Sequence, residues 1–347
     1  MKVIVDDKIP YIREALETMG VDAVYLPGNK IDRATVSDAD ALIVRTRTHC
    51  NADLLEGSQV QFIATATIGY DHIDTAYCAA KGIKWTNAPG CNAASVCQYI
   101  QSTLLLLQLE QGIQLNEATI GIVGVGHVGT LVAEMARRWG MRTLLCDPPR
   151  ADRGEQGFVS LETIAQEADI ITLHTPLVRK GVHPTFHLAD DVFFSSLQRK
   201  PYFINTSRGE TTDTQALLKA LDEGQIAQCI IDVWENEPEI NLFLLDRCYI
   251  GTPHIAGYSA DGKANATRMS LEALAGHFQL GEIPTIEPPH PTAPTIQAKS
   301  RALGLLKVYS PHTDSRTLKS QPERFEQLRG DYPFRREEQA YNFVIED

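Results

Sequence analysis

Apolar and polar residues alternate along this chain in two rhythms, one typical of buried strands and one typical of helices. In the first ninety residues the pattern predicts strands at 3–5, 41–44 and 62–66 and helices at 11–19 and 71–80. From residue 119 onward the alternation becomes regular, with six further strands predicted at 120–123, 143–146, 170–173, 202–205, 229–233 and 249–250. Strands that alternate with helices form parallel sheets covered by helices, so we expect an α/β protein.

Two long helical patterns and one proline-rich segment divide the chain. The helical patterns cover 92–111 and 261–280, and the segment from Pro284 to Pro294 forms a stiff connector. The tail beyond it is mixed in polarity and shows no evident set of strands. We therefore expect two Rossmann-like, doubly wound parallel-sheet domains with a cleft between them, followed by a small α+β C-terminal extension.

The first strand of the second region runs into a glycine-rich turn, with Gly124, Gly126 and Gly129 in G-x-G-x-x-G spacing. The first glycine permits a tight turn, the second lets the backbone approach a pyrophosphate, and the third lets the following helix pack close to the strand. That helix begins with His127 and Val128, where free N–H groups and a partial positive charge favour phosphate. The turn therefore predicts dinucleotide binding.

Asp147 ends the next strand, where dinucleotide-binding proteins place a carboxylate that accepts hydrogen bonds from the adenosine ribose. A carboxylate there repels a 2′-phosphate, which favours NAD over NADP, although the neighbouring Arg150 argues the other way. The expected domains are an NAD-binding domain, a substrate-binding lid and the C-terminal extension, at 95–257, at 1–94 with 258–282, and at 283–347.

Composition limits the partners and the compartment. The 347 residues carry a formal net charge of −12, which argues against nucleic acid, because binding there depends on neutralising phosphates. No apolar run approaches the ~18 residues of a membrane span, and the N-terminus lacks the pattern of a signal peptide. Seven cysteines without a C-x-x-C pair indicate reduced thiols in a cytoplasmic protein. No metal site is expected, since Pro184 separates His183 from His187 and no cysteine lies near them.

Ligands of an open α/β sheet bind outside the carboxyl ends of its strands. Arg208 follows the fourth strand of the second region, Glu237 follows the fifth and His254 follows the sixth. His254 is the natural base for the proton of an alcohol, because its usual pKa lies near neutrality. Glu237 would orient its ring, and Arg208 would hold a substrate carboxylate and polarise the adjacent carbonyl. Taken singly, each is more often a structural or surface residue; their joint placement predicts a 2-hydroxy acid dehydrogenase.

Five stretches resemble the D-isomer-specific 2-hydroxy acid dehydrogenase family, within a match from about residue 40 to residue 282. They are Gly-Val-Gly-His-Val-Gly at 124–129, His-Thr-Pro-Leu at 174–177, Asn-Thr-Ser-Arg-Gly at 205–209, Ile-Asp-Val-Trp-Glu-Asn-Glu-Pro at 231–238 and Thr-Pro-His-Ile-Ala-Gly at 252–257. The stretches at 88–93, 145–154 and 250–258 and the C-terminal extension resemble the branch that oxidises 4-phospho-D-erythronate. Two features depart from the family pattern: Glu210 to Thr212 replace a usually apolar position, and the tail is short.

The resemblance implies NAD-dependent oxidation of 4-phospho-D-erythronate to the 2-oxo acid, a step in the synthesis of pyridoxal 5′-phosphate. It implies Arg208 and Glu237 as active-site residues and His254 as the acid/base. The NAD contacts that it implies are Asp147, Thr175, Asp232 and Gly257. The substrate contacts that it implies are Thr46, Thr67 and Tyr258. It also implies a homodimer formed partly by the C-terminal extension.

A phosphorylated substrate on an acidic protein needs local cations. Arg45 and Arg47 flank Thr46 just after the predicted strand at 41–44. On an extended segment, side chains two residues apart point the same way. We expect one of the two arginines to bind the 4-phosphate; the alternative is a pair of exposed charges.

Two other functions fit the same motifs. A sister enzyme acting on 3-phosphoglycerate or glycerate would keep these residues, and only substrate discrimination would separate it. A non-catalytic NAD(H)-sensing regulator would keep the fold and the cofactor. Replacing His254 separates this second alternative, since an enzyme loses turnover while a sensor keeps its binding and its partner.

Overall fold

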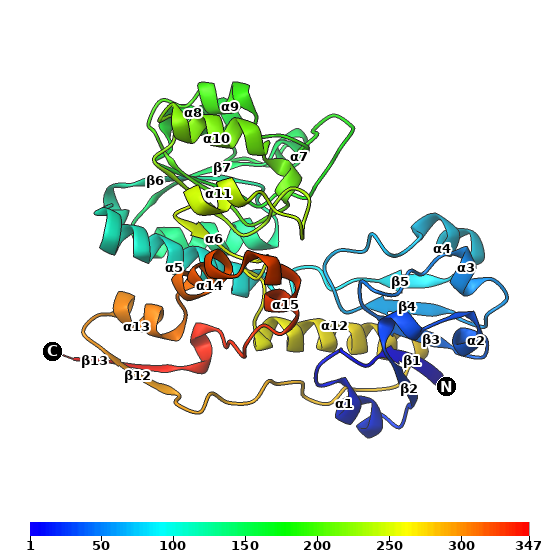
Figure 1. Cartoon of the computed structure of the whole chain (residues 1–347). Coiled ribbons are helices and arrows are strands. Elements are labelled where there is room, and N and C mark those ends of the chain that lie inside the picture. Colours follow the sequence, from blue (N-terminus) through cyan, green and yellow to red (C-terminus); the bar gives the residue numbers. More distant parts are fainter. Residues whose placement is uncertain (347) are drawn as a thin grey trace. The chain divides into compact units, whose positions relative to one another are not determined.

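The structure, a computed structural model, describes residues 1–346 and divides into two compact units. Unit 1 comprises Met1–Asn92 and Ser259–Thr292, and unit 2 comprises Ala93–Tyr258 and the chain from Ala293 onward (Figure 1). These units divide the chain after residues 92, 258 and 292, where the expected domains divide it after residues 94, 257 and 282. The residues from 293 onward group with unit 2.

Unit 1 holds a five-stranded parallel sheet in the order β2-β1-β3-β4-β5. Its strands are β1 (Lys2–Asp6), β2 (Asp22–Leu26), β3 (Ala41–Val44), β4 (Phe62–Thr65) and β5 (Lys84–Thr86). Its helices are α1 (Ile12–Thr18), α2 (Arg33–Val36), α3 (Ala52–Leu55), α4 (Thr75–Lys81) and α12 (Ala260–Phe278), with a 3-10 turn at Gly28–Lys30. The strand order reverses at β1, as in other doubly wound sheets.

Strand β3 is buried on both faces. Ala41 and Ile43 belong to the apolar cluster that α12 completes with Leu271, while Leu42 and Val44 belong to the cluster on the opposite face. Parallel strands covered on both faces are continuous apolar runs, which is why the sequence predicts β3 and β4. The sequence does not predict β2 and β5, because β2 is an edge strand of half-exposed residues and β5 has three residues.

Unit 2 holds a six-stranded parallel sheet in the order β11-β10-β9-β8-β6-β7. Its strands are β6 (Thr119–Val123), β7 (Arg142–Cys146), β8 (Ile170–Leu173), β9 (Tyr202–Asn205), β10 (Gln228–Ile231) and β11 (Ile250–Gly251). Its helices are α5 (Ala93–Gln111), α6 (His127–Arg138), α7 (Pro148–Asp152), α8 (Leu161–Glu167), α9 (Asp191–Ser195), α10 (Thr214–Asp222) and α11 (Leu242–Arg247). All six predicted strands are present, and the predicted class of two doubly wound parallel sheets is confirmed.

The two faces of this sheet are covered by different helices. Ile170 and Ile204 point into a cluster with residues of α5 and α6, while Ile171 and Phe203 point into a cluster with residues of α8 to α11. The switch in strand order lies between β6 and β8, so the loops after these strands frame the crevice where such sheets bind ligands.

The tail adds its own elements to unit 2. They are β12 (Thr295–Ala298), α13 (Arg301–Val308), α14 (Pro311–Ser320), α15 (Phe325–Gly330) and β13 (Asn342–Ile345). Leu318 and Phe325 are fully buried in the cluster on one face of the six-stranded sheet, where each contributes about 1.5–3 kcal/mol. The sequence predicts a small α+β extension without an evident set of strands; the tail holds helices and the two strands β12 and β13, which pair in parallel. Their residues are mostly exposed, so the apolar alternation that marks a strand is weak.

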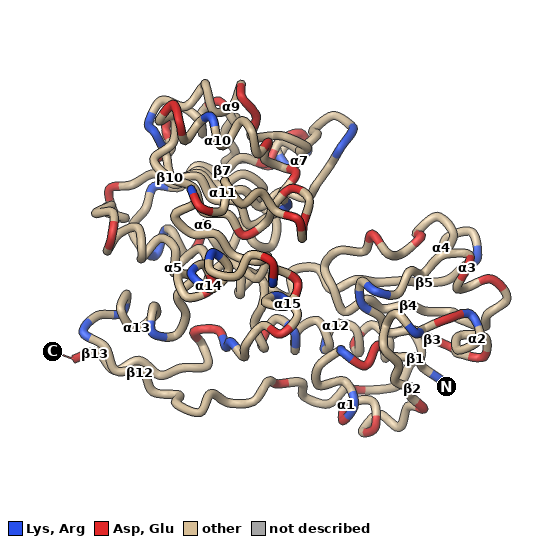
Figure 2. Tube along the Cα trace, viewed as in Figure 1, with Lys and Arg blue, Asp and Glu red and all other residues tan. Residues whose placement is uncertain are grey.

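Charged residues of both signs are intermixed over each unit (Figure 2). Acidic residues outnumber basic ones, 44 to 32, so an anionic substrate depends on cations placed locally. Within residues 1–346, no helix combines the length and the apolar character that a bilayer crossing requires.

Candidate active site

The three glycines of the turn between β6 and α6 have different surroundings. An ideal Cβ on Gly129 would lie 2.1 Å from the carbonyl oxygen of Gly124, and one on Gly124, whose φ is +87°, would lie 2.7 Å from the carbonyl of His174. A Cβ on Gly126 would meet no atom within 4 Å. Gly124 and Gly129 therefore serve the packing of the backbone, while Gly126 borders open space at the uncapped start of α6.

Asp147 ties the strand after the turn back to the turn itself. Its Oδ2 accepts from the N–H of Val125 at 2.9 Å, and its Oδ1 accepts from the N–H of Arg150 at 3.1 Å, which caps α7. The Arg150 guanidinium donates to the carbonyl of Val125 at 2.7 Å and pairs with Glu155 at 2.5 Å. Glu155 already neutralises the charge of Arg150, so Arg150 would bind the 2′-phosphate of NADP only weakly. Its presence therefore does not weigh against NAD as the cofactor.

Thr175, directly after β8, borders the same turn. A Cβ on Gly124 would lie 2.9 Å from the Thr175 methyl group. The Thr175 hydroxyl is buried without a hydrogen-bond partner within residues 1–346. Buried polar atoms are nearly always satisfied, so this one points to a ligand. An unsatisfied hydroxyl, open space at Gly126 and an uncapped helix start fit the pyrophosphate and ribose of a dinucleotide.

His174 lines this crevice as a neutral side chain. Its Nε2 lies 3.0 Å from the hydroxyl of Thr172, and its Nδ1 lies 3.4 Å from the hydroxyl of Thr206. Burial lowers the pKa of His174 to about 3, so the ring is neutral at physiological pH.

Asp232 organises the loop that carries His254. Its buried carboxylate accepts from the Thr252 hydroxyl at 2.5 Å and from the N–H groups of Ile255 and Ala256 at 2.8 and 3.0 Å. Its backbone carbonyl accepts from the N–H of His254 at 2.8 Å. Burial raises the pKa of Asp232, while these donors oppose that rise. The loop's shape thus depends on Asp232, a role that the sequence does not reveal.

His254 and Glu237 form the central pair of the site. His254 Nδ1 lies 2.8 Å from Glu237 Oε2, and the other carboxylate oxygen accepts from the N–H of Trp234 at 2.9 Å. With Nδ1–H donated to the carboxylate, Nε2 is left to exchange a proton. His254 has a φ of +56°, a strained value that the Asp232 and Glu237 contacts hold in place.

The charge of Glu237 is also determined by its surroundings. Burial alone would raise the pKa of Glu237, but the hydrogen bond and charge of His254, the Trp234 amide and the Arg329 guanidinium together hold it below its usual value. The carboxylate is therefore ionised at neutral pH. An ionised carboxylate on Nδ1 stabilises the imidazolium that forms when His254 takes up a proton.

Arg208 belongs to a loop that packs against the loop of Glu237. An ideal Cβ on Gly209 would lie 2.0 Å from the Trp234 carbonyl, so the two backbones touch where only glycine fits. Asn205 fixes the Arg208 loop by donating to the Arg208 carbonyl at 3.0 Å. The Arg208 side chain donates to the Ser207 carbonyl at 2.7 Å and forms no ion pair within residues 1–346. The alternative of a surface ion pair is therefore excluded for the described chain.

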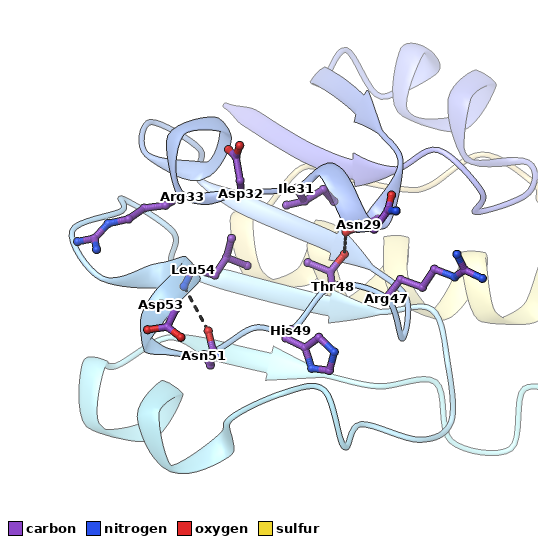
Figure 3. A pocket seen from close by; sticks show the side chains of 11 residues that line it. Asn29, Ile31, Asp32, Arg33, Arg47, Thr48, His49, Asn51, Asp53 and Leu54 are labelled. Carbon is purple, nitrogen blue, oxygen red and sulfur yellow. Dashed lines mark hydrogen bonds between the residues drawn. The ribbon is translucent and has the colours of Figure 1, made fainter. Parts of the chain in front are cut away.

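The two arginines proposed for phosphate lie in unit 1, and one expectation about them is wrong. Residues 45–48 form a turn, with the N–H of Thr48 bonded to the Arg45 carbonyl at 3.2 Å, so the segment is not extended. Thr46 is exposed at the tip. Arg45 Nη1 lies 3.4 Å from the Lys8 carbonyl. Arg47 lines an open pocket of about 360 Å³, where Thr48 donates to the carbonyl of Gly28 at 2.9 Å (Figure 3).

The other two substrate contacts implied by the resemblance lie in different units. Thr67, after β4 in unit 1, shares a hydrogen bond with the Thr65 hydroxyl at 2.7 Å and donates to the Gly69 carbonyl at 2.8 Å. Tyr258 falls at the end of unit 2, not in the lid range expected for it. It follows the half-buried Gly257, and its hydroxyl accepts from Arg329 Nε at 3.1 Å. Arg329, in α15 of the tail, is a residue that sequence reasoning missed.

The histidines of the loop after β8 are engaged by different carboxylates. His183 pairs with Asp152 at 2.6 Å, and His187 pairs with Glu235 at 2.7 Å and Asp213 at 3.5 Å. Over residues 1–346, no group of three or more ligand side chains has the geometry for a metal ion.

Comparison with known proteins places this site in a family. Residues 101–256 match the family model described as D-isomer specific 2-hydroxyacid dehydrogenase, NAD binding domain. The chain is 60% identical to the erythronate-4-phosphate dehydrogenase of Bacteroides thetaiotaomicron, over 99% of each protein. It is 43% identical to the enzyme of that name from Porphyromonas gingivalis, over 99% of this chain and 95% of the relative.

Solved structures agree with this placement. A D-2-hydroxyisocaproate dehydrogenase is similar with a TM-score of 0.68 and 26% identity, covering 81% of this chain and 98% of that one. A D-lactate dehydrogenase from Aquifex aeolicus, complexed with NAD and lactic acid, has a TM-score of 0.63 and 25% identity, covering 83% of this chain and all of that one. The predicted NAD cofactor is confirmed. The chain belongs to the erythronate-4-phosphate dehydrogenase family, a branch of the NAD-dependent D-isomer-specific 2-hydroxyacid dehydrogenases.

Proposed function

We propose that this chain oxidises 4-phospho-D-erythronate to (R)-3-hydroxy-2-oxo-4-phosphooxybutanoate with NAD, in the synthesis of pyridoxal 5′-phosphate. The observation that carries the proposal is the His254–Glu237 pair at 2.8 Å, where the loops after β10 and β11 meet. Relatives at 58–60% identity over nearly the whole chain are named for this substrate. The pair supplies the acid/base group that any alcohol oxidation needs.

Each residue of the site has one task in this reaction. NAD supplies the acceptor for the hydride that leaves C2 of the substrate. His254 Nε2 takes the proton of the C2 hydroxyl, and the ionised Glu237 stabilises the resulting imidazolium. Arg208 holds the substrate carboxylate through paired, charge-assisted hydrogen bonds and polarises the forming carbonyl.

The cofactor is held by the crevice between β6 and β8. The turn from Gly124 to Gly129 and the start of α6 take the pyrophosphate. Asp147 accepts from the adenosine ribose, and the unsatisfied hydroxyl of Thr175 gains a partner. Asp232 and Gly257, in the segment that also carries His254, would complete the NAD contacts.

The 4-phosphate is bound in unit 1 by Arg45 or Arg47, beside the substrate contacts Thr46 and Thr67. Two guanidinium groups on one short turn give the local positive charge that an anionic substrate requires on an acidic protein. We expect Arg47→Ala or Arg45→Ala to raise KM for the phosphorylated substrate at least tenfold, because a charge-assisted contact contributes about 1.5–3 kcal/mol. An unchanged KM in both single variants would overturn this assignment.

A homodimer would cover apolar side chains that the tail exposes, namely Leu303, Phe334, Val344 and Ile345. Exposed apolar side chains mark interfaces where they gather into one patch. Analytical ultracentrifugation should give a dimer, and Phe334→Ser should weaken it; a wild-type monomer at micromolar concentration contradicts the proposal. The seven free thiols, none in a disulfide, support a cytoplasmic setting.

The experiment that tests the proposed reaction compares 4-phospho-D-erythronate with 3-phosphoglycerate and glycerate on purified protein. NADH and the 2-oxo product are both quantified, with a second 2-oxo acid added in parallel to reoxidise bound NADH. Turnover of the erythronate phosphate alone supports the proposal. A preference for 3-phosphoglycerate moves the chain to a sister activity. Absence of product with intact NAD binding favours a sensor.

A further inference from the structure

The C-terminal tail brings a cation to the catalytic pair within unit 2. Arg329 lies in α15, four residues after Phe325, a residue that is 1% exposed and belongs to the core of unit 2. Its Nε donates to the Tyr258 hydroxyl at 3.1 Å, and its Nη1 lies 3.9 Å from Glu237 Oε2. Phe325 and Leu318 anchor the tail in the core, so the position of Arg329 depends on the same packing that holds unit 2 together.

The oxygen of Glu237 that Arg329 approaches is the one that contacts His254. Glu237 Oε2 lies 2.8 Å from His254 Nδ1 and 3.9 Å from Arg329 Nη1, so one carboxylate oxygen joins a fixed cation to the acid/base ring. A fixed positive charge near an imidazole disfavours its protonated form, and near a carboxylate it favours the ionised form. The ionised Glu237 carboxylate stabilises the imidazolium of His254, and Arg329, which shares the same carboxylate oxygen, weakens that stabilisation.

We propose that Arg329 is a positioning residue for the oxidation, which acts through Glu237 and Tyr258 to hold the His254 ring in place and to limit how strongly Glu237 stabilises its imidazolium. The inference rests on the proposed function, since it takes His254 as the acid/base. It adds a residue that lies outside the glycine turn and the three strand-end loops.

The surroundings of Arg329 favour this role over direct binding of the substrate phosphate. Its side chain is 31% exposed, and its guanidinium already faces Glu237, Tyr258 and Glu326, the last at 3.8 Å. Tyr332 packs edge-on against the Tyr258 ring at 5.9 Å, so the tail contacts Tyr258 twice. A cation that is already neutralised by two carboxylates attracts a further anion weakly.

The charged groups around His254 have opposing effects. Glu237 and the buried Asp232 favour the imidazolium, while Arg329 disfavours it. The Glu326 carboxylate, 3.8 Å from Arg329 Nη1, partly offsets the charge of Arg329. Removing the arginine alone therefore shifts the balance toward protonated His254.

The test compares Arg329→Gln and Arg329→Lys with Arg324→Gln, a matched change on the same tail segment at an exposed arginine that bonds Gln327. The pH profile of kcat/KM for NAD-linked oxidation is measured for each. In Arg329→Gln the acid limb should move to higher pH by about half a unit, because the nearby opposing charge is lost. Arg329→Lys should restore most of the shift, and Arg324→Gln should match the wild type.

A titration of His254 by NMR, with its signal identified through His254→Asn, gives a second readout that needs no turnover. It should show the same upward shift in Arg329→Gln, even if the true substrate is another 2-hydroxy acid, so failure of the proposed substrate is distinguishable. An unmoved His254 titration in folded Arg329→Gln overturns the inference. A tenfold rise in KM with an unmoved acid limb also overturns it and makes Arg329 a substrate ligand.

Discussion

Replacing Gly129 with alanine should damage both the fold and NAD binding, while the same change at Gly126 should damage NAD binding alone. A Cβ at position 129 would lie 2.1 Å from the Gly124 carbonyl oxygen and 3.1 Å from its carbon. Both are backbone atoms of a turn, so the clash is relieved only by moving the turn. Such overpacking costs about 1–3 kcal/mol, offset by about 1 kcal/mol of helix propensity.

The change at Gly126 meets a different environment. A Cβ there has no neighbour within 4 Å, and the φ of −82° is open to any residue, so the cost to the fold is about 0.5 kcal/mol or less. The methyl group would occupy the open space that we propose for the pyrophosphate of NAD. NAD should therefore bind at least tenfold more weakly, which corresponds to about 1.4 kcal/mol.

The assay combines urea unfolding with NAD titration by calorimetry, and Gly276→Ala in α12, where a Cβ also meets open space, is the control. Gly129→Ala should lower the unfolding midpoint and abolish tight binding. Gly126→Ala should keep the midpoint. The control should keep NAD binding and should not lower the midpoint, because alanine in a helix interior gains up to about 1 kcal/mol over glycine. If Gly126→Ala binds NAD as the wild type does, the crevice beside α6 is not the pyrophosphate site.

Three further changes test the site from other directions. Asp147→Ala should reduce the preference for NAD over NADP about tenfold in competition titrations, and adding Glu155→Ala should reduce it further by freeing Arg150; an unchanged preference refutes the ribose assignment. The pKa of His174 is lowered to about 3 in the folded protein, so between pH 6.5 and 3 the ring is protonated only when the chain unfolds. The free energy of unfolding should therefore fall by up to about 1.4 kcal/mol per pH unit as the pH drops through this range. His174→Asn should flatten this slope in urea unfolding measured at several pH values. Asp232→Asn replaces one carboxylate oxygen with an NH2 group that faces a backbone N–H, so the free energy of unfolding should fall by about 1–3 kcal/mol and kcat should fall too. Wild-type values of both quantities would exclude the role of Asp232 in the loop.

The sequence predicts the strands that are buried on both faces and misses those at edges. In β8, Ile170 and Ile171 face opposite apolar clusters, so the strand reads as a continuous apolar run. Such a short run is typical of a buried parallel strand. β2, β5, β12 and β13 are edge or two-stranded elements. Polar residues are exposed in β2, β5 and β12, while β13 exposes the apolar Val344 and Ile345. Their pairing depends on neighbours that are distant in sequence, so local pattern is a weak guide to them.

The positions of the candidate catalytic residues were predictable because the sheet topology determines them. Parallel strands end at one edge, so Arg208, Glu237 and His254 could be expected there before any geometry was known. The packing that holds them was not predictable in the same way. Asp232 acts through a network of backbone N–H groups, and Arg329 enters from a tail whose position depends on tertiary packing.

The central claim is that His254, oriented by Glu237, removes the proton while hydride leaves C2 of a phosphorylated 2-hydroxy acid. The most direct measurement is single-turnover formation of NADH from 4-phospho-D-erythronate by wild type and by His254→Asn, with NAD affinity measured on both. The account predicts equal NAD affinity and a rate at least a hundredfold lower in the variant, in keeping with the usual contribution of a general base. A variant that forms NADH at the wild-type rate would contradict it.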